Sequence, residues 1–142
     1  MNPKMPVPGS AEELVYRIDT ALEGVDLGKD FRRGGMIALA FCDLLRSSLN
    51  ETQKEAAEAA REYWSGNDSG NHRTYVHIFA DVTRRDQVEG ADRASAAINR
   101  LVWVALNTNT EFSGYQAEFL TFLGVDAGLS VQAMSDVFSK YV

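Results

Sequence analysis

Histidine and carboxylate side chains are the first candidates for chemistry, and few of them are suitably spaced in this chain. It contains two histidines, His72 and His77, and His77 precedes Asp81 by one helical turn. Such a pair could provide two metal ligands or an acid–base couple. Two ligands are too few for a tight metal site, so we expect His77 to be a half-buried or capping side chain.

The longer motifs of catalysis and cofactor binding do not occur in the sequence. The sequence contains neither the G-x-G-x-x-G nor the G-x-x-x-x-G-K-[ST] phosphate-binding motif. It also lacks the H-E-x-x-H and Glu-x-x-His spacings of metal sites and the G-x-S-x-G motif of serine hydrolases. Cys42, the single cysteine, excludes an intramolecular disulfide, and in its apolar surroundings an inert buried thiol is expected. We therefore expect no enzymatic activity, no metal and no cofactor.

Two further sets of residues could bind a ligand. Residues 67–100 hold as many acids as arginines, so internal ion pairing is expected there rather than an anion site. The arginines are Arg73, Arg84, Arg85, Arg93 and Arg100. The second set is aromatic and could line a pocket between the last two helices, although aromatic residues at helical spacing more often form plain core. It comprises Phe112, Tyr115, Phe119, Phe122, Phe138 and Tyr141.

An acidic stripe is the most distinctive pattern in the chain. Residues 50–66 (NETQKEAAEAAREYWSG) predict a helix that begins at Glu51, capped by Asn50 with Gln53, and has an alanine-rich buried side. The opposite side of this helix carries Glu51, Glu55, Glu58 and Glu62. A basic partner would gain from meeting this stripe, and the alternative is an ordinary solvated helix face.

Size and charge limit the class of protein. A chain of 142 residues with 45% hydrophobic residues is expected to form one domain with its own core. The net charge of −6 disfavours nucleic acid and anionic membranes as partners, because both require clustered Lys and Arg. We see no signal-peptide-like or membrane-spanning apolar segment, and we expect a cytoplasmic protein.

The hydrophobic spacing predicts an all-α fold, with residues 1–9 as a flexible proline-rich arm and residues 10–142 as a single helical domain. Ser10 with Glu13 forms a capping box for the first helix, which Gly24 ends. A second helix, capped by Asp30, is expected to reach Ser48 and to be the buried centre of the fold. Two adjacent glycines of this segment, Gly34 and Gly35, mark either a helix start or a close crossing of two helices.

Residues 72–84 fit either a helix or a strand, and we favour a helix because no partner strand is available. Helices are also expected from Ala91 to Asn107, from a Thr110 cap to Gly124, and after a Ser130 cap. The expected fold is a single-domain bundle of about six helices, with antiparallel or irregular orthogonal packing.

The helix ending of residues 55–66 (EAAEAAREYWSG), the all-helical pattern and the acidic charge resemble small bacterial immunity proteins of toxin–immunity systems. The resemblance implies inhibition by occlusion, without chemistry, of a cationic partner such as a toxin domain. On this interpretation the contacts are Glu51, Glu55, Glu58 and Glu62, with Glu111 and Glu118 as additions. The alternatives are a small-ligand-binding helical bundle and a phage- or defence-associated regulatory adaptor subunit.

Overall fold

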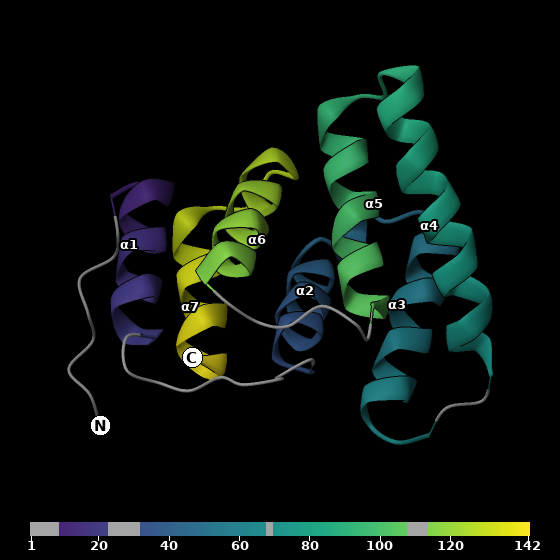
Figure 1. The fold of residues 1–142 in the computed structure, drawn as a ribbon, viewed down its shortest axis with the longest axis horizontal. Coiled ribbons are helices and arrows are strands. Elements are labelled where there is room, and N and C mark those ends of the chain that lie inside the picture. Colours follow the sequence, from purple (N-terminus) through teal and green to yellow (C-terminus); the bar gives the residue numbers. More distant parts are fainter. Residues whose placement is uncertain (1–8, 23–31, 68–69, 108–113) are drawn as a thin grey trace.

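The computed structural model describes residues 9–22, 32–67, 70–107 and 114–142 (Figure 1). Within these residues the fold is entirely helical, as expected, with seven α-helices rather than about six. They are α1 (Ala11–Leu22), α2 (Arg32–Leu44), α3 (Glu51–Trp64), α4 (Asn71–Glu89), α5 (Arg93–Leu106), α6 (Gly114–Asp126) and α7 (Val131–Tyr141). The ambiguous segment 72–84 lies inside α4, so the choice of helix over strand was correct.

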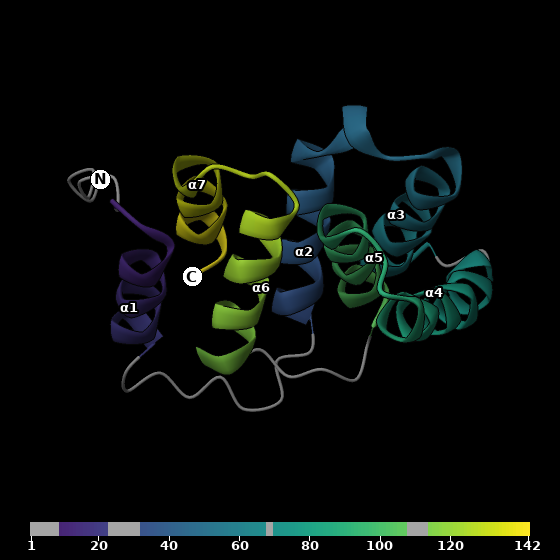
Figure 2. The same cartoon turned by 90° about the horizontal axis from the view of Figure 1, so that it is seen from above.

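The helices form two groups around a central pair. Helices α2 and α5 pack against each other in the middle, with α1, α6 and α7 on one side and α3 and α4 on the other (Figures 1 and 2). No helix among the described residues combines the length and apolar character needed to cross a membrane.

Helix α2 is the buried centre that its apolar run predicts, and Ile37, Ala38, Phe41 and Cys42 are fully buried. It ends at Leu44, and a short 3₁₀ helix (Arg46–Ser48) follows where the α-helix was expected to continue. The expected cap at Asp30 lies outside the described residues.

The paired glycines of α2 lie in its first turn and also mark close crossings. A Cβ atom placed on Gly34 would come within 2.3 Å of the Gln116 side chain of α6. One placed on Gly35 would come within 2.7 Å of the Trp64 ring of α3. Both expectations for these glycines, a helix start and a close approach, are therefore met.

Local capping follows the sequence with one difference. Asn50 and Gln53 form both bonds of a capping box at the start of α3, and Ser130 caps α7. Ser10 accepts a hydrogen bond from the Glu13 backbone N–H, but the Glu13 carboxylate accepts one from the N–H of Gly9 at 2.6 Å. The Gly24 and Thr110 assignments lie outside the described residues.

Helix α6 departs most from expectation. Phe119 and Phe122, favoured as plain core from their spacing, are 39% and 38% exposed, whereas Leu120 and Leu123 are buried. The reason is that α6 is apolar nearly all round, so its periodicity does not indicate which side is covered. Its neighbours α1 and α5 determine that side.

Candidate functional site

Helix α3 is anchored by a flat, alanine-rich surface. Ala56, Ala57 and Ala60 are buried against α2, α4 and α5, and their small side chains allow these helices to approach closely. The indole Nε1 of Trp64 donates a hydrogen bond to the carbonyl oxygen of Ala105 in α5 at 2.8 Å. The helix is therefore held at both ends, by its capping box and by this tryptophan.

The opposite side of α3 carries the predicted glutamates. Glu51, Glu55 and Glu58 are exposed, and Glu62 is half-buried. The exposed fraction of the side chain is 84% for Glu51 and 56% for Glu58. We call the surface formed by Glu51, Glu55, Glu58 and Glu62 the acidic face.

Two cations of the same helix reduce the charge of the acidic face. The Lys54 ammonium lies 3.5 Å from the Glu51 carboxylate, and the Arg61 guanidinium lies 3.3 Å from Glu58. Arg61 also pairs with Asp43 of α2 at 2.5 Å, and this hydrogen bond is the main reason that the pKa of Arg61 is raised. Four glutamates and Asp43 against two cations leave a formal charge of −3.

Asp43 and Tyr75 were not predicted as part of this surface. The Tyr75 hydroxyl of α4 donates a hydrogen bond to Glu55 at 2.6 Å, and this bond raises the pKa of Tyr75. Asp43 and Tyr75 are 18 and 20 residues from their partners, so no local sequence pattern could have identified them.

Glu118, one of the two additional glutamates, does not extend the acidic face. Glu118 is exposed on α6, and α2 and α5 lie between α6 and α3 (Figure 2). Glu111 lies outside the described residues.

The residues considered for metal binding or catalysis are dispersed. His77 is exposed rather than half-buried, and the nearby Asp81 pairs with Arg84 and Arg85. His72 is buried, stacks on Tyr63, and contacts the Leu106 carbonyl oxygen through Nε2 at 2.6 Å. No group of three metal-ligating side chains occurs among the described residues.

Cys42 is buried, as its apolar surroundings predict. Burial is the main cause that raises the pKa of its thiol from 9.0 to about 12. Because the thiolate is the reactive form, this thiol is inert at neutral pH.

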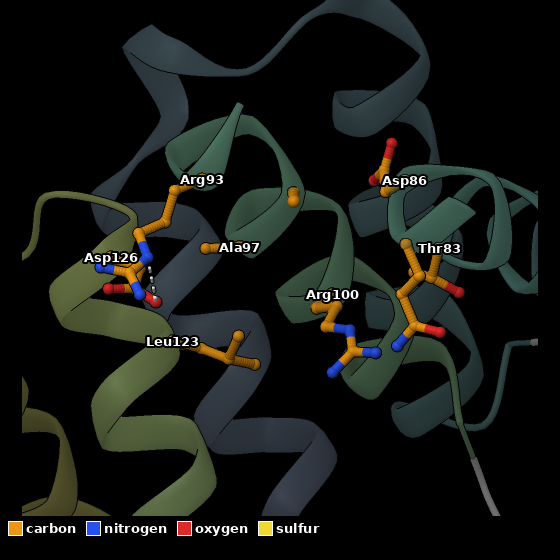
Figure 3. A pocket seen from close by; sticks show the side chains of 9 residues that line it. Thr83, Asp86, Arg93, Ala97, Arg100, Leu123 and Asp126 are labelled. Atoms are coloured by element: carbon orange, nitrogen blue, oxygen red, sulfur yellow. Dashed lines mark ion pairs between the residues drawn. The ribbon is translucent and has the colours of Figure 1, made fainter. Parts of the chain in front are cut away.

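A shallow groove of about 300 Å³ runs over α5, between α4 and α6 (Figure 3). Arg93 of α5 lies beside Asp126 of α6 at one end, with 3.8 Å between charged atoms, and Ala97 and Arg100 follow along α5. The Arg100 guanidinium lies 5.8 Å from the centre of the Phe119 ring. The ion pairing expected within residues 67–100 therefore holds for Arg84 and Arg85, which pair with Asp81. Arg93 instead pairs with Asp126 outside that segment, and Arg100 meets an aromatic ring.

The members of the aromatic set that the structure describes do not line the groove over α5. Phe138 is buried in an edge-to-face contact with Phe41, with 5.7 Å between ring centres. Phe119 and Phe122 are partly exposed, and the residues lining the groove include no aromatic side chain. Phe112 and the Tyr115 side chain lie outside the described part.

The acidic face on α3 and the mixed-charge groove over α5 are thus surface features with potential function in the described part of the chain. Comparisons of the chain with protein-family models, with curated proteins and with solved structures found no match.

Proposed function

We propose that this protein is a protein-binding inhibitor that docks the acidic face of α3 onto a cationic partner protein and occludes it. The observation that carries the proposal is the exposure of Glu51, Glu55 and Glu58 on a helix whose other side is buried in the fold. The carboxylates are therefore presented on a rigid element, which lowers the entropy cost of binding.

The charge of the acidic face favours binding of a cationic partner more than it favours the stability of helix α3. Pairs of like charge one turn apart, such as Glu51 with Glu55 and Glu58 with Glu62, disfavour an isolated helix by a few tenths of a kcal/mol each, roughly what the lysine and arginine pairs regain. A basic surface would relieve this repulsion and would also accelerate association through long-range attraction.

The resemblance of residues 55–66 to immunity proteins specifies the class of partner. A toxin domain that binds polyanionic substrates has a cationic site, and a row of carboxylates on a helix can occupy such a site in place of phosphates. The protein then acts by covering the site of its partner.

The experiment is an affinity pull-down from the source cells, with identification of the retained protein, followed by charge reversal of the acidic face. Glu51→Lys, Glu55→Lys and Glu58→Lys are combined in one variant; the half-buried Glu62 is left unchanged. We expect retention of one basic protein, and loss of roughly 3- to 150-fold in its affinity for the variant, on the basis of about 0.2 to 1 kcal/mol for each of the exposed pairs.

A matched control has the same charge change elsewhere. Glu12→Lys, Asp19→Lys and Asp136→Lys alter exposed carboxylates of α1 and α7, across the central pair from α3. This variant should bind almost normally at moderate salt, because these sites lie away from the contact. Equal binding by both variants, with unchanged far-UV circular dichroism, would exclude the acidic face as the docking surface.

A further inference from the structure

Helix α6 exposes a row of apolar side chains. Phe119, Phe122 and Val125 are 39%, 38% and 41% exposed and lie on one side of the helix, and we call them the α6 stripe. Two carboxylates, Glu118 and Asp126, stand at its two ends. Contiguous exposed apolar side chains with a polar rim are typical of interaction surfaces.

Helix α5 runs antiparallel beside the α6 stripe, and two contacts define the register. The first contact joins Arg93 of α5 to Asp126 of α6. The second joins Arg100, seven residues later in α5, to the ring of Phe119, seven residues earlier in α6. Phe122 is therefore level with Ala97 at the middle of this two-helix face.

The floor of the groove over α5 is apolar between Arg93 and Arg100, where Ala96 and Ala97 lie beside Leu123 of α6. The α4 side of the groove is polar and is formed by Thr83, Asp86 and Gln87. The groove's volume of about 300 Å³ can receive an aromatic side chain. The small side chains of Ala96 and Ala97 leave room there for a larger side chain.

The charges on this face have a pattern that complements itself. Both cations, Arg93 and Arg100, are on α5, and both carboxylates, Glu118 and Asp126, are on α6, one of each at either end. A two-fold axis that lies in this face, parallel to the two helices and midway between them, places α5 of one copy over α6 of the other. Arg93 then meets Asp126 of the second copy, and Arg100 meets its Glu118.

The partners needed for these pairs are available. Among the described residues Glu118 has no ion-pair partner. The guanidinium of Arg100 contacts the ring of Phe119 and no carboxylate. The side chain of Arg93 is 85% exposed, and its 3.8 Å pair with Asp126 is long. The same rotation places Phe122 over the groove at Ala96 and Ala97 of the second copy.

We propose that two copies of this chain form a two-fold dimer through α5 and α6, in which Phe122 of each copy enters the α5 groove of the other. The dimer surface is separate from the acidic face on α3, so the proposal does not depend on the proposed function (Figure 2). It makes the middle of the interface apolar and its rim ionic, which is the usual arrangement in protein interfaces.

The first test is the oligomeric state, measured by sedimentation equilibrium over a concentration series. The wild-type chain is expected to form a dimer, and Phe122→Glu is expected to raise the dimer dissociation constant by about 30-fold or more, as for a central aromatic contact. Tyr16→Glu makes the same kind of change at a 72% exposed aromatic residue of α1 and should leave the dimer intact. Far-UV circular dichroism checks that both variants remain folded.

The second test exchanges charges between copies. Glu118→Arg alone and Arg100→Glu alone each place like charges opposite each other twice, and each should weaken the dimer by about 10-fold. An equimolar mixture of the two variants pairs every charge correctly in a heterodimer, which native mass spectrometry can identify. A wild-type chain that is monomeric at every soluble concentration, a Phe122→Glu dimer as tight as wild type, or a mixture without preferred heterodimers would overturn the proposal.

Discussion

The indole of Trp64 donates its N–H to the carbonyl oxygen of Ala105, joining the last turn of α3 to the last turn of α5. The same ring lies against Gly35, where a Cβ atom would come within 2.7 Å of it. One side chain thus sets the spacing of three helices, α2, α3 and α5, and holds the helix that carries the acidic face.

We expect Trp64→Phe to lower the free energy of unfolding by about 1 to 3 kcal/mol, because the buried Ala105 carbonyl loses its partner while an aromatic ring remains. Urea denaturation followed by far-UV circular dichroism measures this. Trp103→Phe is the control, since the half-buried Trp103 indole donates no hydrogen bond to the described residues. An equal loss in both variants would show that ring size rather than the hydrogen bond matters.

Gly35→Ala is expected to destabilise the wild-type protein by about 1 to 3 kcal/mol, because the added methyl group collides with the Trp64 ring. In a Trp64→Ala background the same substitution should instead stabilise α2 by about 0.5 to 1 kcal/mol through helix propensity. A double-mutant cycle by urea denaturation checks the change of sign. The same sign in both backgrounds would contradict the close contact between this ring and this glycine.

Asn99 connects three helices through its side-chain amide. It accepts a hydrogen bond from Gln53 of α3 at 2.8 Å and donates one to Asp86 of α4 at 2.9 Å. Asn99→Ala should lower the free energy of unfolding by about 1 to 3 kcal/mol, because the buried Gln53 amide loses its acceptor. Asp86→Asn keeps an acceptor for Asn99 and should cost less; chemical denaturation compares the two, and the reverse order would refute this account.

The buried thiol of Cys42 predicts a loss of stability in alkali. Its pKa is about 12 in the folded protein and near 9.0 when unfolded, so the unfolded chain loses the proton first. The contribution of the protonated Cys42 thiol to the free energy of unfolding is therefore fully present below pH 9. It falls as the pH rises toward 12, by up to about 1.4 kcal/mol per pH unit. Cys42→Ala should flatten this part of the stability–pH curve measured by urea denaturation; parallel curves for both proteins would disprove the effect.

Arg61 lowers the charge of the acidic face, so Arg61→Gln should strengthen binding of the cationic partner. The substitution keeps part of the aliphatic stem and frees Asp43 and Glu58 from their pair. We expect an association rate a few times faster at low salt, roughly 2- to 5-fold, measured by stopped flow. Arg84→Gln, which removes a cation paired with Asp81 on α4, is the matched control and should have little effect. A slower rate for Arg61→Gln would indicate that this arginine contacts the partner.

Much of the helical framework could be predicted because its causes are local. Asn50 and Gln53 cap α3 with their own backbone neighbours, and the alanines of α3 repeat at helical spacing. The outward position of Glu51, Glu55 and Glu58 follows from the same spacing. Gly34 and Gly35 were interpreted as a helix start or a close crossing, without any indication of what they meet.

The sequence by itself therefore determined the helices, their caps and the solvent side of α3, since each depends on residues within about a turn. Only the tertiary structure decided that Phe119 and Phe122 of the evenly apolar α6 lie at the surface, and that Arg61 pairs with Asp43 and Tyr75 with Glu55. The physical reason is that these outcomes depend on which helices pack together, and packing joins residues far apart in the chain by side-chain shape and volume, which no local periodicity encodes.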